Sequence, residues 1–310
     1  MGRKGSTVQR AAMTEDEVLA LFDACSNAGR WGPDDELGTL NFITDATRVR
    51  AASLVRQGRA LSVGKDLDTV WSLRNPDPVV HRMLYLQHDA PTSSLDSIEI
   101  ASHGFSTTHI DALGHVYFEG QIYNGRKASD VVKREGLAAA SIHAYREGIF
   151  TRGVLLDVAA ARGVDWLEPH EGVWVDDLER AEEMAGVKVT SGDAIFVRVG
   201  LSAREAAQGK EDPSARAGLE AECVRWIHER EVAVFSGDCI ERLPQPYSRL
   251  TMPLHMIGLA SMGLAILDAT ELEELRLVCR DLKRYEFLLT CAPLRLRGGT
   301  GSPVNPIAVF

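Results

Sequence analysis

Four side chains able to bind a metal ion or to move a proton lie within one short segment, residues 102–125: His103, His109, Asp111 and His115. His109 and Asp111 are two residues apart, so on an extended strand both side chains point to the same face. Residues 112–114 are small or turn-forming and can bring the chain back, so that His115 passes the same point. The segment therefore predicts a strand followed by a return of the chain around one functional point.

The residue types in this segment indicate a metal site. Imidazole and carboxylate groups that converge on one point suit a divalent metal such as zinc or manganese. A further histidine just beyond the ligands can act as a general base or acid. A single histidine is more often a surface residue or a hydrogen-bonded core residue, but four such side chains with an aspartate at strand spacing favour the metal site.

Composition excludes several classes of partner. The chain has 310 residues and a net charge of −10, and no basic stripe offers a surface for nucleic acid. No run of about eighteen apolar residues predicts a membrane span. No phosphate-binding glycine motif follows a predicted strand, so a nucleotide cofactor is not expected. The glycine-rich loop 298–302 leads to a proline rather than a helix, and we predict no phosphate site there. We expect a small-molecule substrate, with neither nucleic acid nor membrane as partner.

The cysteines and the N-terminus favour a cytoplasmic protein. The five cysteines are far apart, and no CxxC pair occurs among Cys25, Cys223, Cys239, Cys279 and Cys291. We predict that they are reduced, buried thiols. Residues 1–13 are basic and lack the apolar stretch of a secretory signal, so they are predicted to form a flexible tail or an extension before a start at Met13.

Hydrophobic patterns predict mixed secondary structure along the whole chain. Helices are expected at residues 14–25, 44–57, 127–132, 175–185, 217–229, 254–262 and 272–279. Strands are expected at residues 60–67, 82–87, 97–102, 152–158, 192–200, 232–236, 264–267, 286–291 and 307–310. Because helices and strands mix throughout without a repeat or linker, we predict one α/β domain over residues 14–310.

A second group of polar residues, Asp238, His255 and Asp268, lies in the C-terminal half. Asp268 follows an apolar run, and a carboxylate at the end of a buried strand is costly unless it is paired or binds a cation. The alternative for Asp268 is a helix N-cap. Trp31, in a loop rich in glycine, proline and aspartate, is either a core residue under the loop or an aromatic wall for a substrate.

Several motifs, in order, resemble the cyclase-like metal hydrolases that include bacterial kynurenine formamidase and isatin hydrolase. The resemblance extends from about Arg30 to the C-terminus, and it rests on the following segments: RWGPDDELGTLN (30–41), THIDALGH (108–115), YNG (123–125), RGVLLDV (152–158), GDAIFVR (192–198), SGD (236–238), His255, Asp268 and GTGSPVNPIAV (299–309). It implies a swivelling β/β/α fold with a barrel-like central sheet and flanking helices, and a homodimer or homotetramer.

The resemblance also implies roles for individual residues. His109 and Asp111 match metal ligands of the family, and His115 matches its proton-transfer residue. His255 and Asp268 match the later histidine and acidic ligands, although the family usually has glutamate there and Asp268 lies one position later. The cofactor implied is a divalent metal, zinc or manganese.

The chain departs from the family at Phe105. The family pattern places its first histidine at this position, and a phenylalanine cannot bind a metal. His103 lies two residues earlier, on the same face of a regular strand, and can serve as a substitute ligand. Without that substitution the site has lost a ligand and is mononuclear or weak.

The leading functional hypothesis is a metal-dependent hydrolase of a cyclic amide, a lactone or an aryl formamide, with metal-bound water as the nucleophile and His115 as general acid or base. Trp31 and Phe105 could stack on a flat substrate ring. The alternatives are cyclase or dehydratase chemistry at the same metal site, and a non-catalytic binding protein whose site has decayed.

Overall fold

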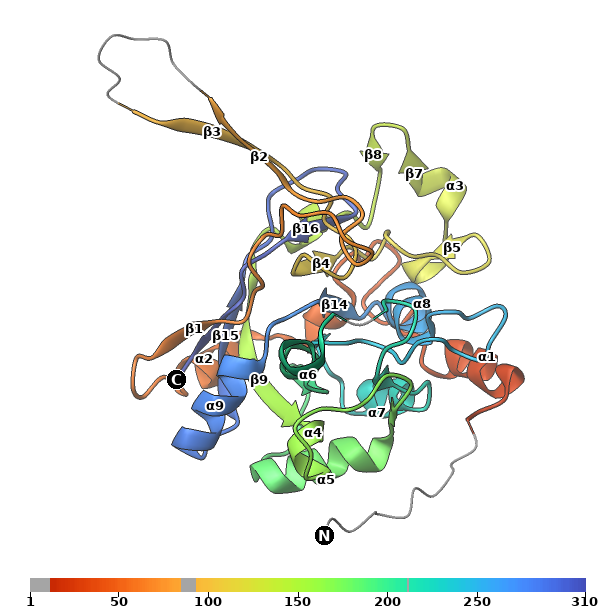
Figure 1. The fold of residues 1–310 in the computed structure, drawn as a ribbon. Helices are drawn as coiled ribbons and strands as arrows, with labels where there is room; N and C mark the ends of the chain where they lie inside the picture. Colours follow the sequence, from red (N-terminus) through yellow and green to blue (C-terminus); the bar gives the residue numbers. More distant parts are fainter. Residues whose placement is uncertain (1–11, 85–92, 211) are drawn as a thin grey trace.

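The central element is a mixed nine-stranded sheet that curls into a half-barrel (Figure 1). In a computed structural model that describes residues 12–84, 93–210 and 212–310, the strands lie side by side in this order: β1 (Ala60–Ser62), β17 (Ile307–Val309), β15 (Glu286–Cys291), β9 (Ile149–Asp157), β11 (Ala194–Arg198), β13 (Val234–Gly237), β14 (Ala265–Asp268), β4 (His109–Asp111) and β16 (Gly301–Pro303). The prediction of one α/β domain is confirmed, as are the barrel-like sheet and its flanking helices.

The middle of the sheet is parallel, and its edges are antiparallel. The strands β9, β11, β13 and β14 run parallel to one another, and every residue of the last three is buried. Such continuous apolar strands need cover on both faces. Beyond β14, the strand β4 pairs antiparallel with both β14 and β16, so the segment that carries His109 and Asp111 lies between two strands from the C-terminal third of the chain.

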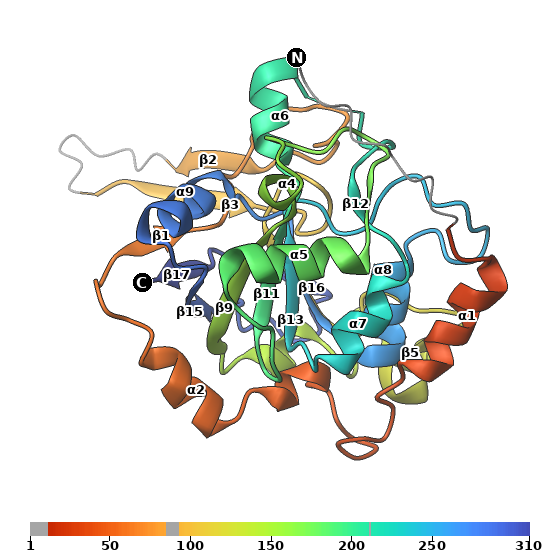
Figure 2. The ribbon, with the colours of Figure 1, turned by 90° about the horizontal axis from the view of Figure 1, so that it is seen from below.

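Helices cover the sheet on both sides. Figure 2 shows α4 (Val158–Ala161), α5 (Val175–Ala185) and α7 (Cys223–Glu229) on one side of the parallel strands. The helix α2 (Asp45–Ala52) packs against β9 and β15. At the other end of the sheet, α8 (Pro253–Ile257) continues into a π-helical turn, η4 (Gly258–Met262), and both pack against α1 (Glu15–Ala24). The helix α6 (Leu201–Gln208), which the hydrophobic pattern does not predict, follows β11, and α9 (Glu273–Leu282) follows β14.

Short elements complete the fold. The strands β2 (Val80–Leu84) and β3 (Leu95–Glu99) form a hairpin that projects from the body (Figure 1). The remaining elements are η1 (Gly38–Phe42), β5 (Gln121–Ile122), η2 (Tyr123–Gly125), β6 (Arg126–Lys127), α3 (Ala128–Val131), β7 (Val132–Lys133), β8 (Gly136–Leu137), η3 (Ile142–Tyr145), β10 (Gly172–Val173) and β12 (Gly218–Leu219).

Buried charges tie the connecting segments to the sheet. The guanidinium of Arg198, which is 1% exposed, pairs with Asp157 at 2.8 Å and with Glu273 at 2.7 Å, so it joins β9, β11 and α9. Asp238 accepts backbone N–H groups from Val199 and Gly200, each at 2.8 Å, and from Leu201 at 2.9 Å, so its carboxylate satisfies the start of α6. Asp238 therefore has a structural role rather than a place in the second polar cluster.

Some predicted elements are wrong or shorter than expected. The helix expected at 217–229 begins only at Cys223, because residues 218–219 form β12 and pair with β10, so tertiary pairing overrides the helical pattern. The strand expected at 60–67 stops at Ser62, and the helix expected at 44–57 stops at Ala52. Residues 85–87 of the strand expected at 82–87 lie outside the described residues.

The N-terminal predictions are tested in part. Residues 1–11 of the expected tail lie outside the described residues, and Met13 is partly buried against the core. Thr14 caps α1 as expected, in a reciprocal capping box with Glu17. All five cysteines are buried, and none of them forms a disulfide. Within the described ranges, no helix has the length and apolar character needed to cross a membrane.

Candidate metal centre

The strand register brings the first candidate ligands together. In β4, His109 and Asp111 point to one face while Ile110 between them is fully buried. The antiparallel pairing of β4 with β14 sets His109 directly opposite Asp268, so these two side chains share a face of the sheet. The Nε2 atom of His109 lies 3.5 Å from Oδ1 of Asp111. His109 and Asp111 therefore share one face, as their two-residue spacing predicts. The pairing of β4 with β14 adds a second carboxylate, Asp268, from far along the chain.

A tight turn returns the chain after β4. The backbone N–H of His115 donates to the carbonyl of Ala112 at 2.9 Å, which closes a four-residue turn. As a result Nε2 of His115 lies 3.9 Å from Oδ1 of Asp111, and its side chain is 28% exposed. Gly114 leaves little room for a larger residue in this turn, because a Cβ there would lie 2.7 Å from Cδ1 of Leu137 and 3.1 Å from the carbonyl oxygen of Ala140. His115 thus stands at the rim of the cluster, open to an incoming molecule.

His103 reaches the cluster by a different route from the one predicted. Strand β3 ends at Glu99, and residues 103–107 form a series of bends that includes Gly104 at φ +119°, so the argument from regular strand parity is wrong. Nevertheless Nδ1 of His103 lies 3.0 Å from Oδ1 of Asp111. The ring stacks on that of His115, with centroids 3.6 Å apart and planes 5° apart. His103, His109 and Asp111 form the tightest group of possible ligands in the described ranges.

The second polar cluster supplies two more groups. His255, from α8, has its Nε2 atom 4.0 Å from Oδ2 of Asp111 and 3.7 Å from Oδ2 of Asp268. Asp268 is not a helix N-cap, because α9 begins five residues beyond it, with Leu272 as its N-cap. The side chains of His109, Asp111, His255 and Asp268 are all buried.

Two of the histidines are held with a defined nitrogen toward Asp111. Nδ1 of His109 lies 2.8 Å from the carbonyl oxygen of Thr107, so this nitrogen carries the proton and Nε2 presents its lone pair. Nδ1 of His255 lies 2.7 Å from Oε1 of Glu241, whose other oxygen accepts the backbone N–H of His255 at 3.2 Å. Partners of this kind fix the tautomer and ring orientation of metal-binding histidines.

The hydrogen bonding of Asp111 fits a cation. Neither of its carboxylate oxygens has a hydrogen bond among the described residues, although the side chain is fully buried. The contact with His103 is short enough for an ion pair but lacks hydrogen-bond geometry, and Nδ1 of His103 is also without a hydrogen bond in the described part of the chain. Buried polar atoms are normally satisfied, so a divalent metal would complete the bonding of these atoms.

The pKa values of the cluster residues distinguish the candidate ligands from the candidate proton carrier. Burial opposes the ionisation of Asp111, but the facing imidazoles of His103, His109 and His115 hold its pKa well below the usual value. Burial lowers the pKa of His115 to about 4, against the pull of the Asp111 charge, so this imidazole is neutral near pH 7. Burial also opposes protonation of His255, yet the carboxylates of Glu241 and Asp268 raise its pKa.

The two predicted aromatic residues lie in different surroundings. The ring of Trp31 packs edge-on against Phe42, with centroids 5.1 Å apart, and the Arg30 guanidinium lies over it. Phe105 lies in the bends between β3 and β4, and the Arg216 guanidinium is 4.5 Å from its ring centroid. Neither residue is placed against a substrate by these contacts, so their part in substrate binding stays a prediction.

Three residues near the cluster were missed by sequence reasoning. Glu241 lies three residues beyond the SGD segment, and Thr300 lies in the glycine-rich loop, where its hydroxyl is 2.9 Å from Nε2 of His103. Tyr145 is buried, and its hydroxyl has no hydrogen bond in the described ranges. Burial and the Asp111 charge raise the pKa of Tyr145 well above its ordinary value, so it remains a neutral donor. Two quoted segments offered a signal, because Glu241 follows SGD (236–238) and Thr300 lies within GTGSPVNPIAV (299–309), whereas no such segment lies at Tyr145.

Comparison with known proteins agrees with this geometry. Residues 46–241 match the family model described as "Putative cyclase". The crystal structure of a novel cyclase is similar at 29% identity and a TM-score of 0.82, over 92% of this chain and 99% of that one. No curated protein sequence matches the chain.

Two further structures share the fold at low identity. Isatin hydrolase A from Labrenzia aggregata, bound to benzyl benzoate, is similar at 18% identity and a TM-score of 0.59, over 83% of this chain and 94% of that one. A predicted metal-dependent hydrolase from Bacillus stearothermophilus is similar at 14% identity and a TM-score of 0.50, over 81% of this chain and 97% of that one.

Proposed function

The chain belongs to the cyclase family, and on that premise we propose that it is a metal-dependent hydrolase of a cyclic amide, a lactone or an aryl formamide. The observation that carries the proposal is the buried Asp111 carboxylate, which faces imidazole nitrogens and has no hydrogen bond of its own among the described residues. The fold is shared with an isatin hydrolase and with a predicted metal-dependent hydrolase, which supports the same reading.

The proposed ligands are His103, His109, Asp111, His255 and Asp268. Their nitrogen and carboxylate donors suit zinc and manganese alike. When bound, a metal of this type lowers the pKa of water toward neutrality and polarises a carbonyl group. The ligand His103 replaces the histidine that the family pattern places at Phe105, so we propose a working site rather than a decayed one.

The protein's own groups would then handle the proton. His115 is neutral near pH 7 because burial lowers its pKa to about 4, so it can accept a proton from the attacking water. The same imidazolium can then deliver that proton to the leaving nitrogen or oxygen. Stacking on His103 restricts the His115 ring to one plane, which keeps its exposed edge toward the substrate.

The proposal is tested by hydrolysis assays on cyclic amides, lactones and aryl formamides with zinc- or manganese-loaded protein. We expect at least one class to be hydrolysed, with a loss of about 10²- to 10⁴-fold in kcat for His115→Ala, the range for a general acid or base. The control is His81→Ala, which removes an exposed histidine paired with Asp96 on the projecting hairpin. If His109→Ala and Asp111→Ala together leave the rate unchanged, the proposal is wrong.

Product analysis separates this reaction from cyclisation or dehydration at the same site. Hydrolysis adds one water to the substrate, whereas the alternatives remove one, so the mass of the product decides between them.

A further inference from the structure

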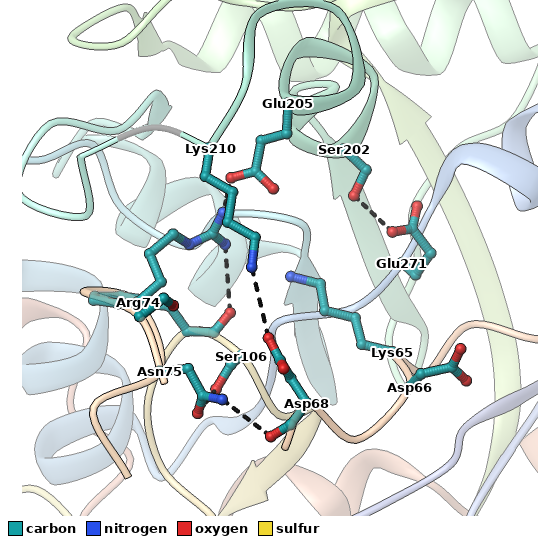
Figure 3. Close-up of a pocket in the computed structure, with 12 residues that line it drawn as sticks. Lys65, Asp66, Asp68, Arg74, Asn75, Ser106, Ser202, Glu205, Lys210 and Glu271 are labelled. Carbon is teal, nitrogen blue, oxygen red and sulfur yellow. Dashed lines mark hydrogen bonds and ion pairs between the residues drawn. The ribbon is translucent and has the colours of Figure 1, made fainter. Parts of the chain in front are cut away.

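A cavity lies beside the segment that leads into β4, because Phe105 and Ser106 are part of its lining. It has a volume of 190 Å³, and its lining is rich in charge, with Lys65, Arg74, Glu205, Lys210 and Glu271 around the same space (Figure 3). The volume corresponds to several water molecules at about 30 Å³ each, so the cavity can hold a small organic anion but not a nucleotide. Phe105 contributes an apolar side to this otherwise polar space.

Lys65 is the cation in this cavity whose charge is not matched. Its side chain points into the middle of the space in Figure 3, and no described residue forms an ion pair or hydrogen bond with its ammonium group. The acids around it already have partners. Glu205 pairs with Arg74, and Glu271 accepts the hydroxyl of Ser202 at 2.6 Å.

The remaining charged residues of the lining are Lys210, Asp68 and Asp66. The ammonium of Lys210 lies 3.6 Å from Asp68, and Asp66 points away from the cavity in Figure 3. The hydroxyl of Ser72 lies on the cavity wall without a hydrogen bond in the described ranges, whereas Oε1 of Glu205, which also has none, forms the ion pair with Arg74. The space therefore offers an ammonium and a hydroxyl to a ligand that accepts hydrogen bonds.

The electrostatic surroundings of Lys65 favour an anion. Burial and, after it, the charges of Arg74 and Arg216 lower the pKa of Lys65 to about 8, with Cys239 and Glu271 acting in the opposite direction. Among the neighbouring charges, those of Arg74 and Arg216 act most strongly on this ammonium. An anion in the cavity would be attracted by these cations and would supply the counter-charge that Lys65 lacks.

Two hydrogen bonds link Lys65 to segments that carry candidate metal ligands. The backbone N–H of Lys65 donates to the hydroxyl of Thr108 at 2.9 Å, and that hydroxyl donates to the carbonyl of Ala269 at 2.7 Å. Thr108 and Ala269 are the chain neighbours of His109 and Asp268. Arg216 lies over the Phe105 ring and contributes to lowering the pKa of Asp268, so its charge acts on both spaces.

We propose that this cavity is a carboxylate-binding site in which the Lys65 ammonium is the counter-ion. This proposal rests on the proposed function: the cavity selects substrates that carry a carboxylate beside the bond to be hydrolysed. The same carboxylate chemistry could come from a separate small acid that binds there as an effector, and the experiment distinguishes the two sources.

Binding is measured by calorimetry with benzoate on the metal-loaded protein. We expect benzoate to bind the wild type and to bind Lys65→Met at least tenfold more weakly, because the counter-ion is gone. The control is Lys188→Met, which makes the same change in net charge at an exposed lysine paired with Glu182, and it should bind within twofold of the wild type. Equal binding by wild type and Lys65→Met, or no binding by the wild type, overturns the proposal.

The pH dependence gives a second readout. Lys65 must be protonated to bind the anion, so affinity should fall as the pH rises from 7 to 9, through its pKa of about 8. The charged groups around Lys65 that influence this pH dependence are Arg74, Lys210, Arg216, Asp68, Glu205 and Glu271. Lys65→Arg should keep the binding at pH 9, because arginine remains charged. If Lys65→Met fails to fold by circular dichroism, Lys65→Arg against wild type at pH 9 decides the question.

Kinetics identify the source of the carboxylate. For two substrates that differ only in a carboxylate, Lys65→Met should raise KM about tenfold for the acidic one alone, with kcat unchanged, if the substrate fills the cavity. If benzoate binding depends on Lys65 but neither KM changes, the cavity is an effector site. Absence of all hydrolysis together with Lys65-dependent benzoate binding would refute the proposed function and leave the carboxylate site standing.

Discussion

Glu241 gives the most specific test of how the metal centre is organised. Its carboxylate holds Nδ1 of His255 at 2.7 Å and accepts the backbone N–H of the same residue, and the side chain is 5% exposed. Glu241→Gln keeps the shape of the side chain and removes its charge. The imidazole would then lose the charged partner that fixes its tautomer.

The expected magnitude follows from the kind of contact. Loss of a group that orients a metal-binding histidine costs about 10- to 100-fold in metal affinity, or about 1.4–2.8 kcal/mol. Because glutamine can still accept one hydrogen bond from Nδ1, we expect the lower end for Glu241→Gln and the upper end for Glu241→Ala. Burial of a hydrogen bond to a charged group adds about 1.5–3 kcal/mol to stability, so both variants should also unfold more easily.

The assay is zinc affinity by competition with a chromophoric chelator at pH 8, beside thermal unfolding. The matched control is Glu220→Gln, which changes a glutamate of similar burial whose partner is Arg242 rather than a histidine of the cluster. We expect Glu220→Gln to lose stability without losing zinc affinity. A zinc affinity for Glu241→Gln within twofold of wild type would refute the role given to this residue.

Three further predictions follow from the same geometry. Neighbouring carboxylates raise the pKa values of His109 and His255 in the metal-free protein, despite burial. Because a metal must displace protons from these histidines, metal affinity should fall as the pH drops from 8 to 6, and protons should be released on binding. A metal affinity that does not change with pH in chelator competition would contradict this. Gly301→Ala would place a Cβ 2.7 Å from Cε1 of His103 and should weaken metal binding by about tenfold as that ring is displaced, whereas unchanged affinity would show that His103 is not a ligand. Metal at a hundredfold excess over its Kd should stabilise the fold by about 2.7 kcal/mol, which corresponds to about 4 °C in Tm for a chain of this length, and calorimetry before and after chelation measures it.

Features of the site that depend on residues close in the sequence could be predicted, whereas the way distant segments come together could not. The two-residue spacing of His109 and Asp111 is sufficient to predict their shared face, and the apolar run of residues 286–291 matches β15. The helix expected from residue 14 likewise begins where Thr14 can cap it. In each case the determining interaction spans only a few residues.

What the sequence could not supply depends on pairing between distant segments. The register that puts Asp268 opposite His109 joins strands about 160 residues apart, and the family resemblance rather than any local pattern pointed to it. His103 arrives through irregular bends, for which strand parity has no meaning. Glu241 and Lys65 become noticeable only when their neighbours are known, because a single glutamate or lysine in a polar segment is normally a solvated surface residue.

The most direct test of the account is the metal content of the protein by elemental mass spectrometry, measured on wild type, Asp111→Asn and His81→Ala after purification without added metal or chelator. We predict about one equivalent of zinc or manganese in the wild type and in His81→Ala, as for a single catalytic ion, and its loss in Asp111→Asn. No metal in the wild type after reconstitution with either ion, or full occupancy in Asp111→Asn, would contradict the central claim that the buried Asp111 carboxylate anchors a metal.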